Sequence, residues 1–412
     1  MKIGHARHCI TPQNEFYLIG YRSDNRYEPA TGVHDDIYCN ALLFEQEDKE
    51  VFVFSADVLE FEEEMAEDVK TMLHDQFGIE RDLILLCATH DHSSIVSYHK
   101  GWYTKKFDQA YYDFFLETIV KSYMECKENK QEATMKYGKE TIVGYYGNRN
   151  HPGELADNEV IVVKFYDLQG NAFAGLINWA VHSTVISAEN TQLTSELAGE
   201  VSKHLYPSFG FYPAMIVGAA GDCSNRNERQ GNDFAELARV SNALAQEIAA
   251  IPVETSTSFK DIRYLTIFHT IHHHMEFVHT QINEQIQNLK QTIAKQEDEQ
   301  TRNQIKKRIH NLEKELEVTQ FHLDAKCSVI DMGAMQFFVF PGELGSAFGI
   351  ALKQACANLG LIFGYTNGYY EYFMPKEEYG LSFETIGCKV PKGEAEKLIE
   401  KLKQASRLLS NS

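Results

Sequence analysis

Two histidines spaced two residues apart, His90 and His92, are the side chains of this sequence best suited to metal chemistry. They follow residues 83–87, an apolar run short enough to be a buried strand. A strand end fixes the backbone, and the loop beyond it directs side chains into a crevice. Zinc favours imidazole nitrogen, so an H-x-H pair can present one or both rings to one ion. On the motif alone, two polar loop histidines explain the pattern equally well.

Other candidate ligands share this context, because each follows a predicted strand. They are Asp57, His182, Asp222 and Glu343. Polar groups at successive strand ends meet at one edge of an α/β sheet, so we expect them to lie near the histidine pair. Taken singly, an aspartate after a strand is better explained as a turn cap, and His182 as a satisfied half-buried histidine. Their recurrence in one context favours a joint site.

Two turns carry further polar groups. Residues 221–226 place Asp222 and Ser224 in a tight turn, where a metal or a base can activate a serine nucleophile, although an ordinary Asx or Ser turn is the alternative. The segment lacks the G-x-S-x-G elbow, so a serine–histidine triad is not supported. Arg149 lies in the turn at 147–152, where a fixed guanidinium could bind a substrate carboxylate or carbonyl, or simply face solvent. The histidine-rich run 269–274 begins like a strand, and we leave it out of the site.

Composition excludes several classes of function. The chain has 412 residues, 43% hydrophobic and 24% charged, as expected of a globular enzyme, and its formal net charge is −20. This charge argues against nucleic acid and anionic membrane surfaces as partners. No apolar run approaches the roughly 20 residues needed to cross a bilayer. The N-terminal residues do not have the pattern of a secretory signal. The eight cysteines form no C-x-x-C pair and read as reduced thiols, so we expect a cytoplasmic location.

The apolar pattern predicts an α/β fold with a mixed, partly parallel sheet flanked by helices. Strands at 51–55 and 83–87, joined by a helix over 61–77 that ends at Gly78, form a β-α-β unit with a parallel pair. Strands at 160–166 and 172–179 form a hairpin. Further helices are predicted at 107–126, 194–205, 234–251 and 391–409, and further strands at 214–217, 329–340 and 361–364.

An inserted helical hairpin is predicted between about residues 280 and 320. Its apolar residues recur at spacings of four, three and four in two runs, which are Ile282, Ile286, Leu289 and Ile293, and then Ile305, Ile309, Leu312 and Leu316. This spacing is typical of two antiparallel helices with a coiled-coil-like seam. We therefore expect one α/β domain from residues 1–274 and 326–412, with residues 275–325 inserted. The insert could cover the active site or mediate a homo-oligomer.

In combination, the motifs resemble the catalytic domain of the neutral (non-lysosomal) ceramidase family. They occur in family order at residues 9–12, 18–21, 32–35, 55–57, 88–93, 148–149, 178–184, 221–225, 341–343, 367–372 and 377–379. The blocks A-T-H-x-H-S, N-W-x-V-H and G-D-x-S-x-N are the most specific. The resemblance spans most of the chain except the helical hairpin.

The resemblance implies one catalytic zinc ion and assigns the site residues. His90, His182, Glu343 and Tyr372 would be its ligands, with Tyr369 as the alternative tyrosine. The remaining site residues would lie beside the ion or face the substrate; these are His92, Arg149, Tyr379, and Ser224 with its neighbour Asp222. Ser224 matches the family serine proposed near the scissile amide.

Several positions depart from the family pattern. Cys9 stands where the family has aspartate, Ser94 where it has glycine, and Asn225 where proline follows the serine. No segment matches the family's C-terminal immunoglobulin-like domain or its secretory signal. We therefore expect a substrate other than ceramide itself.

The expected function is zinc-dependent hydrolysis of the amide bond of a small N-acyl substrate. One alternative is an esterase or phosphoesterase that uses the same metal, although residues 93–95 do not supply the D-H of the metallo-β-lactamase pattern H-x-H-x-D-H. Another is a catalytically silent binding protein whose helical hairpin mediates assembly.

Overall fold

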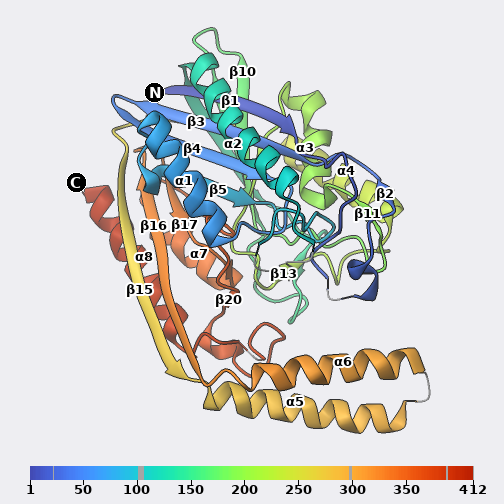
Figure 1. Cartoon of the computed structure of the whole chain (residues 1–412). Coiled ribbons are helices and arrows are strands. Elements are labelled where there is room, and N and C mark those ends of the chain that lie inside the picture. Colours follow the sequence, from blue (N-terminus) through green and yellow to red (C-terminus); the bar gives the residue numbers. More distant parts are fainter. Residues whose placement is uncertain (22, 101–105, 297–298, 387, 412) are drawn as a thin grey trace.

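Three large β-sheets with helices packed on them form the body of the protein, as the computed structural model of residues 1–21, 23–100, 106–296, 299–386 and 388–411 shows (Figure 1). Their strand orders are β5-β4-β3-β1-β6, β12-β10-β9-β7-β14 and β15-β16-β17-β19. The strands are β1 Lys2–Cys9, β3 Tyr38–Gln46, β4 Lys49–Ala56, β5 Ile84–Ala88 and β6 Gln131–Glu132; β7 Thr134–Thr141, β9 Glu159–Tyr166, β10 Ala172–Trp179, β12 Ala214–Val217 and β14 Thr255–Thr257; and β15 Arg263–His274, β16 Gln320–Asp331, β17 Met335–Val339 and β19 Leu359–Phe363.

Small strand pairs and helices complete the described residues. The pairs are β2 Gly32–Val33 with β11 Gln192–Leu193, β8 Gly147–Asn148 with β13 Cys223–Ser224, and β18 Glu343–Leu344 with β20 Tyr372–Phe373. The α-helices are α1 Glu63–Phe77, α2 Gln109–Asn129, α3 Glu196–Phe209, α4 Phe234–Ala250, α5 Glu276–Lys295, α6 Glu299–Glu315, α7 Ser346–Ala355 and α8 Glu394–Asn411. None of the helices in this part of the chain is long and apolar enough to span a bilayer.

The inward faces of the three sheets share one apolar core. Phe44 of β3 packs edge-to-face on Phe165 of β9 and on Phe337 of β17, with ring centroids 5.4 and 6.0 Å apart. One ring comes from each sheet, and all three are fully buried. Strand β4 meets this core on one face and the cluster that contains α2 on the other. Burial on both faces explains why its apolar run is continuous rather than alternating.

Each large sheet contains one parallel strand pair: β4 with β5, β10 with β12, and β17 with β19. The first pair, joined by α1, confirms the predicted β-α-β unit, and Gly78 ends α1 in the left-handed conformation with φ +76°. The hairpin of β9 and β10 is also confirmed. The fold class is therefore the predicted α/β class, with the parallel pairs distributed over three sheets.

Two asparagines tie the carboxyl ends of these pairs together. The Asn178 amide donates to the Ile216 carbonyl at 3.1 Å and accepts from the Ile362 amide at 3.0 Å, which joins β10, β12 and β19. Asn367, in the loop after β19, accepts from the Leu86 amide of β5 at 2.8 Å. These bonds bring the strand ends of different sheets to one place, and this decides where the site forms.

The predicted helical hairpin is present as α5 and α6, which run antiparallel at the far end of the long ribbon formed by β15 and β16 (Figure 1). The predicted seam residues other than Ile293 belong to a separate apolar cluster, in which Ile282, Ile286 and Ile309 are buried. Residues 297–298, at the turn of the predicted hairpin, lie outside the described residues. The division of the chain into domains at 275 and 325 stays a prediction.

One predicted strand is wrong. The apolar run 329–340 was expected to form a single strand, but β16 ends at Asp331 and β17 begins at Met335. The two strands pair antiparallel across a tight turn in which Gly333 has φ +74°. Periodicity alone does not detect this reversal, because both strands are buried and the turn contains apolar residues.

Candidate metal centre

Loops at the carboxyl ends of two parallel pairs position the three central histidines. His90 and His92 follow β5, and His182 follows β10. His90 has φ +57°, a left-handed conformation that is uncommon for a residue other than glycine. Backbone hydrogen bonds from the residues on either side of it, to the carbonyls of Ala56 and Val58, hold this conformation. Such backbone strain persists where the surrounding structure enforces it, as it does at functional sites.

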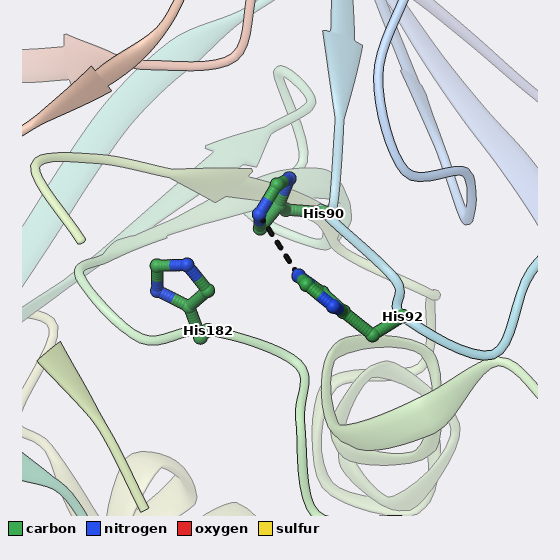
Figure 2. A group of neighbouring side chains, drawn as sticks. All are labelled: His90, His92 and His182. Carbon is green, nitrogen blue, oxygen red and sulfur yellow. Dashed lines mark hydrogen bonds between the residues drawn. The ribbon is translucent and has the colours of Figure 1, made fainter. Parts of the chain in front are cut away.

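The three imidazole rings point toward one another (Figure 2). The Nε2 atoms of His90 and His92 are 3.0 Å apart. One nitrogen from each of His90, His92 and His182 can be chosen so that all three lie within 4.8 Å of one another. All of them are at least half buried. This is a group of three nitrogens that can hold a metal ion.

Backbone carbonyls fix the protonation of all three rings. The Nδ1 of His90 lies 2.9 Å from the Leu59 carbonyl, that of His92 lies 2.7 Å from the Gly20 carbonyl, and that of His182 lies 3.1 Å from the Cys223 carbonyl. A carbonyl only accepts hydrogen bonds, so each Nδ1 carries the proton and donates it. With the proton on Nδ1, each ring turns its Nε2 toward the others, which is the arrangement of metal-ligating histidines.

Burial keeps the rings of His90 and His92 neutral. It lowers the pKa of His90 to about 4 and that of His92 well below its ordinary value. Two lone pairs that face each other at 3.0 Å repel, and a cation between them removes the repulsion. The donor set therefore fits a divalent ion. Gly20 contributes to this geometry, because it has φ +108° and a Cβ at this position would lie 2.4 Å from the Cα of His92.

Glu343 adds a carboxylate to the histidines. It begins β18, after β17, and its Oε2 lies 2.9 Å from the Nε2 of His182, while its Oε1 lies 3.7 Å from the Nε2 of His90. All three side chains are almost fully buried. A metal ion held between this nitrogen and the carboxylate oxygen would satisfy both groups. The structure thus brings together three of the four predicted ligands.

The tyrosine-rich loop surrounds this carboxylate. Tyr365 donates to the Oε2 of Glu343 at 3.2 Å, and Tyr369 donates to its Oε1. Tyr372 lies opposite Glu343 in the β18–β20 pair, and burial raises the pKa of its hydroxyl. Both candidate tyrosines therefore lie beside Glu343, and the choice of Tyr372 as the ligand stays a prediction.

Arg149 reaches the same tyrosine from the loop after β8. Its Nη2 donates to the hydroxyl of Tyr372 at 3.1 Å and to the carbonyl of Gly221 at 2.8 Å. Its Nε donates to Glu384 at 2.6 Å. Arg149 is thus a fixed group of the site and not part of a surface turn.

Asp222 lies in the β12–β13 connection, and Ser224 is the second residue of β13. The two carboxylate oxygens of Asp222 accept from the amide and the hydroxyl of Ser346 at 2.7 and 2.9 Å, at the start of α7. These two hydrogen bonds indicate a structural role for Asp222. Ser224 is buried beside Cys223, whose carbonyl holds His182, and its hydroxyl accepts from the Arg226 amide at 3.3 Å.

Three other polar residues, two of them candidates and one from the excluded run 269–274, form hydrogen bonds outside the histidine group. The hydroxyl of Tyr379 donates to the Val390 carbonyl at 2.7 Å, so its predicted place in the site stays untested. Asp57 accepts from the Tyr38 amide at 2.9 Å, in keeping with the structural explanation. His269 lies in β15 and its Nε2 is 3.0 Å from Glu394 of α8.

Sequence reasoning missed two acidic residues. Glu384 pairs with Arg149, but it lies in a loop without a recognisable motif, so only the tertiary fold reveals it. Glu60 is 3% exposed, and its Oε2 has no hydrogen-bond partner among the residues that the structure describes. Its position three residues before the acidic first turn of α1 makes it look like one more surface charge in the sequence.

Comparisons with known proteins concern the family and the fold. The family model described as neutral/alkaline non-lysosomal ceramidase, N-terminal, matches residues 1–206, which is half of the chain. A solved structure of a ceramidase complexed with C2 is similar with a TM-score of 0.76 at 15% identity, and the match covers 100% of this chain and 75% of that one. Neutral ceramidase from Pseudomonas aeruginosa is similar with a TM-score of 0.74 at 17% identity, covering 99% and 74% of the two chains. At these identities the structural likeness shows a shared fold.

Proposed function

Because the chain belongs to the neutral/alkaline non-lysosomal ceramidase family, which implies hydrolysis of an amide bond, we propose that it is a zinc-dependent hydrolase of N-acyl compounds. The observation that carries the proposal is the convergence of the bare Nε2 atoms of His90, His92 and His182 beside the Glu343 carboxylate. A metal ion between these groups would satisfy the lone pairs and the carboxylate together.

The ligands in this proposal are His90 and His182 through Nε2, Glu343 through its carboxylate, and Tyr372 through its oxygen. Imidazole and carboxylate are the ligands that zinc takes in catalytic sites. The hydrogen bonds from Nδ1 to backbone carbonyls hold each ring in the tautomer and orientation that ligation needs. Tyr365 and Tyr369 orient Glu343 in the same way.

Zinc, when bound, polarises an amide carbonyl and lowers the pKa of water to roughly 7. The chain's own residues do the remaining work. His92 would lie beside the ion or face the substrate, held in place by the donor bond from its Nδ1 to the Gly20 carbonyl. Arg149 holds the Tyr372 hydroxyl. Ser224 positions the amide of the substrate from its place beside Cys223.

The test compares metal-stripped with zinc-restored protein on N-acylethanolamine, N-acylglycine, ceramide, and a matched ester and phosphoester. We expect amide cleavage only after zinc is restored, and loss of both zinc and activity in Glu343→Gln. Glu377→Gln is the matched control, because this side chain is 69% exposed at the surface. Folded, zinc-loaded protein that cleaves no amide contradicts the proposal, and cleavage of the ester or phosphoester alone supports the alternative function.

The same panel tests the expectation that ceramide is not the preferred substrate, which stays a prediction. A cytoplasmic location and self-association through α5 and α6 also stay predictions. Self-association is tested by light scattering, which gives the molar mass of the intact protein. The comparison is a variant with added charged residues on the exposed faces of α5 and α6.

A further inference from the structure

Strand β15 is a long open edge of the third sheet. It pairs with β16 along all 12 residues from Arg263 to His274 and, within the described residues, with no other strand. The other strands that end a large sheet have at most 5 residues. Figure 1 shows β15 at the outer margin of the molecule, with α8 packed beside it. An unpaired strand edge is a template for a further strand, and β15 offers by far the longest one.

The hydrogen-bonding pattern shows which backbone groups this edge offers. The Met275 amide donates to the Thr319 carbonyl at 3.1 Å, in the register that continues the pairing of β15 with β16. Alternate residues of an antiparallel strand direct their N–H and C=O groups to opposite sides. The odd-numbered residues of β15 therefore bond to β16, and the even-numbered residues point outward. These outward residues are Tyr264, Thr266, Phe268, Thr270, His272 and His274.

Most of the outward backbone groups are unpaired. The Phe268 carbonyl accepts from the Nζ of Lys401 at 3.1 Å, and the His274 carbonyl accepts from the Nδ1 of His273 at 2.8 Å. The remaining outward N–H and C=O groups have no partner among the residues that the structure describes. Lys401 is an exposed, long side chain of α8 that can turn away. The edge is thus available to another strand.

This edge lacks the features that keep open strands apart. Natural edge strands carry lysine, proline, inward charges or a bulge. Residues 264–274 contain no lysine, proline, aspartate or glutamate, and the register with β16 has no shift. The whole chain has a formal net charge of −20, so two copies repel wherever their acidic surfaces face each other. A strand without acidic residues is a surface on which two copies can meet.

Exposed apolar side chains lie on both sides of the edge. Phe268 is 66% exposed, and it lies on the face away from α8, because its neighbour His269 faces Glu394 of that helix. Leu408 is 65% exposed and lies two turns after Lys401, on the face of α8 that reaches the edge. A second strand beside β15 would cover the first of these and bring a second α8 beside the other.

We propose that β15 is the dimer interface of this protein and pairs antiparallel with β15 of a second copy. The two-fold axis passes through Phe268, so that this ring lies opposite Phe268 of the partner subunit. The outward groups of Tyr264 then face those of His272 of the partner subunit, and the reverse. Aromatic pairs across an antiparallel ladder are favourable, and a two-fold axis gives a closed pair rather than a fibre. A second copy is the favoured occupant because the edge is complementary to itself.

The experiment measures the molar mass of the full chain by light scattering over a dilution series. We expect twice the 47.1 kDa of one chain at high concentration. Phe268→Lys puts two ammonium groups opposite each other and should raise the dimer Kd by about tenfold or more. Leu168→Lys is the matched control, because Leu168 is 74% exposed in the turn between β9 and β10, and its Kd should equal that of the wild type.

A second variant separates association from folding. Thr270→Pro removes one outward N–H and leaves the bonds to β16, which come from the odd-numbered residues, so proline is tolerated there. It should weaken the dimer at least as much as Phe268→Lys while its Tm at monomeric concentrations stays within a few degrees of the wild type. Hydrogen exchange adds a direct readout, because the amides of Phe268 and Thr270 should be protected only in the dimer.

A wild type that is monomeric at every concentration overturns the inference. A dimer that Phe268→Lys and Thr270→Pro leave intact overturns it as well. If charged residues on α5 and α6 dissociate the dimer and those at β15 do not, the helical hairpin is the interface instead. Protection of the outward amides that does not depend on concentration also contradicts the proposal.

Discussion

Zinc should stabilise this protein against heat, and His182 should be required for that effect. An ion that binds only the folded state stabilises it by about 2.7 kcal/mol when free zinc is 100 times Kd, and by about 4.1 kcal/mol at 1,000 times Kd. At about 2.1 cal/mol/K per residue, the 412 residues give an unfolding entropy of about 0.9 kcal/mol/K. The expected rise in Tm is therefore about 3 °C at the lower zinc concentration and about 5 °C at the higher one.

The structure says which substitution removes this rise. His182→Ala deletes the nitrogen that lies 2.9 Å from Glu343, and so should abolish the zinc-dependent shift in Tm at both concentrations. His269→Ala is the matched control, because His269 is also buried and paired with a glutamate, Glu394, but lies in β15. It should lower the Tm without zinc and leave the zinc-dependent shift intact.

Differential scanning calorimetry of the chelated and zinc-titrated proteins measures both quantities. A shift in His182→Ala equal to that of the wild type would refute the reasoning, because zinc would then bind elsewhere. Loss of the shift in His269→Ala alone would refute it as well, since it would place the ion at the β15 histidines.

Three further substitutions test the geometry around the centre. Gly20→Ala should lower the free energy of unfolding by about 3 kcal/mol in urea titrations, because its Cβ would lie 2.4 Å from the His92 Cα; a change below about 0.5 kcal/mol would contradict this. Asn367→Ala should cost about 3 kcal/mol by the same assay, since it leaves the Leu86 amide and the Ile84 carbonyl unpaired, and a near-neutral effect would mean that water replaces the side chain. Burial, with the charge of Glu343, raises the pKa of Glu60 to about 8 from 4.5, so the folded state keeps a proton that the unfolded chain releases. Stability of the metal-free protein should therefore fall between about pH 4.5 and 8, by up to about 1.4 kcal/mol per pH unit, and Glu60→Gln should remove that fall; parallel pH profiles of the two proteins would rule this out.

The local sequence pattern was enough to predict the elements whose geometry depends on residues close together in the chain. The β-α-β unit of β4, α1 and β5 and the hairpin of α5 and α6 were predictable because apolar spacing and the glycine stop at Gly78 are local signals. The run 329–340 was not, because the end of β16 and all of β17 are buried on either side of the turn, so the apolar pattern continues across it. Only pairing of β16 with β17 reveals it.

Some residues of the candidate site could be predicted from the sequence and others could not. His90, His182 and Glu343 could be nominated together because each follows a buried strand, and the structure brings them within contact of one another. The position of Tyr379 and the engagement of Asp222 with Ser346 could not be foreseen, because they depend on which distant backbone groups lie within reach.

By itself, the sequence determined the kinds of ligand this protein can offer and the strand ends that carry them. Both can be recognised from short stretches of sequence, because a buried strand and the polar residues after it are adjacent in the chain. Tertiary structure alone decided the protonation of the rings, the pairing of Arg149 with Glu384 and the isolation of Glu60. These depend on carbonyls and carboxylates from segments that are remote in sequence. Their energies come from distance and burial, which no spacing of residues along a chain encodes.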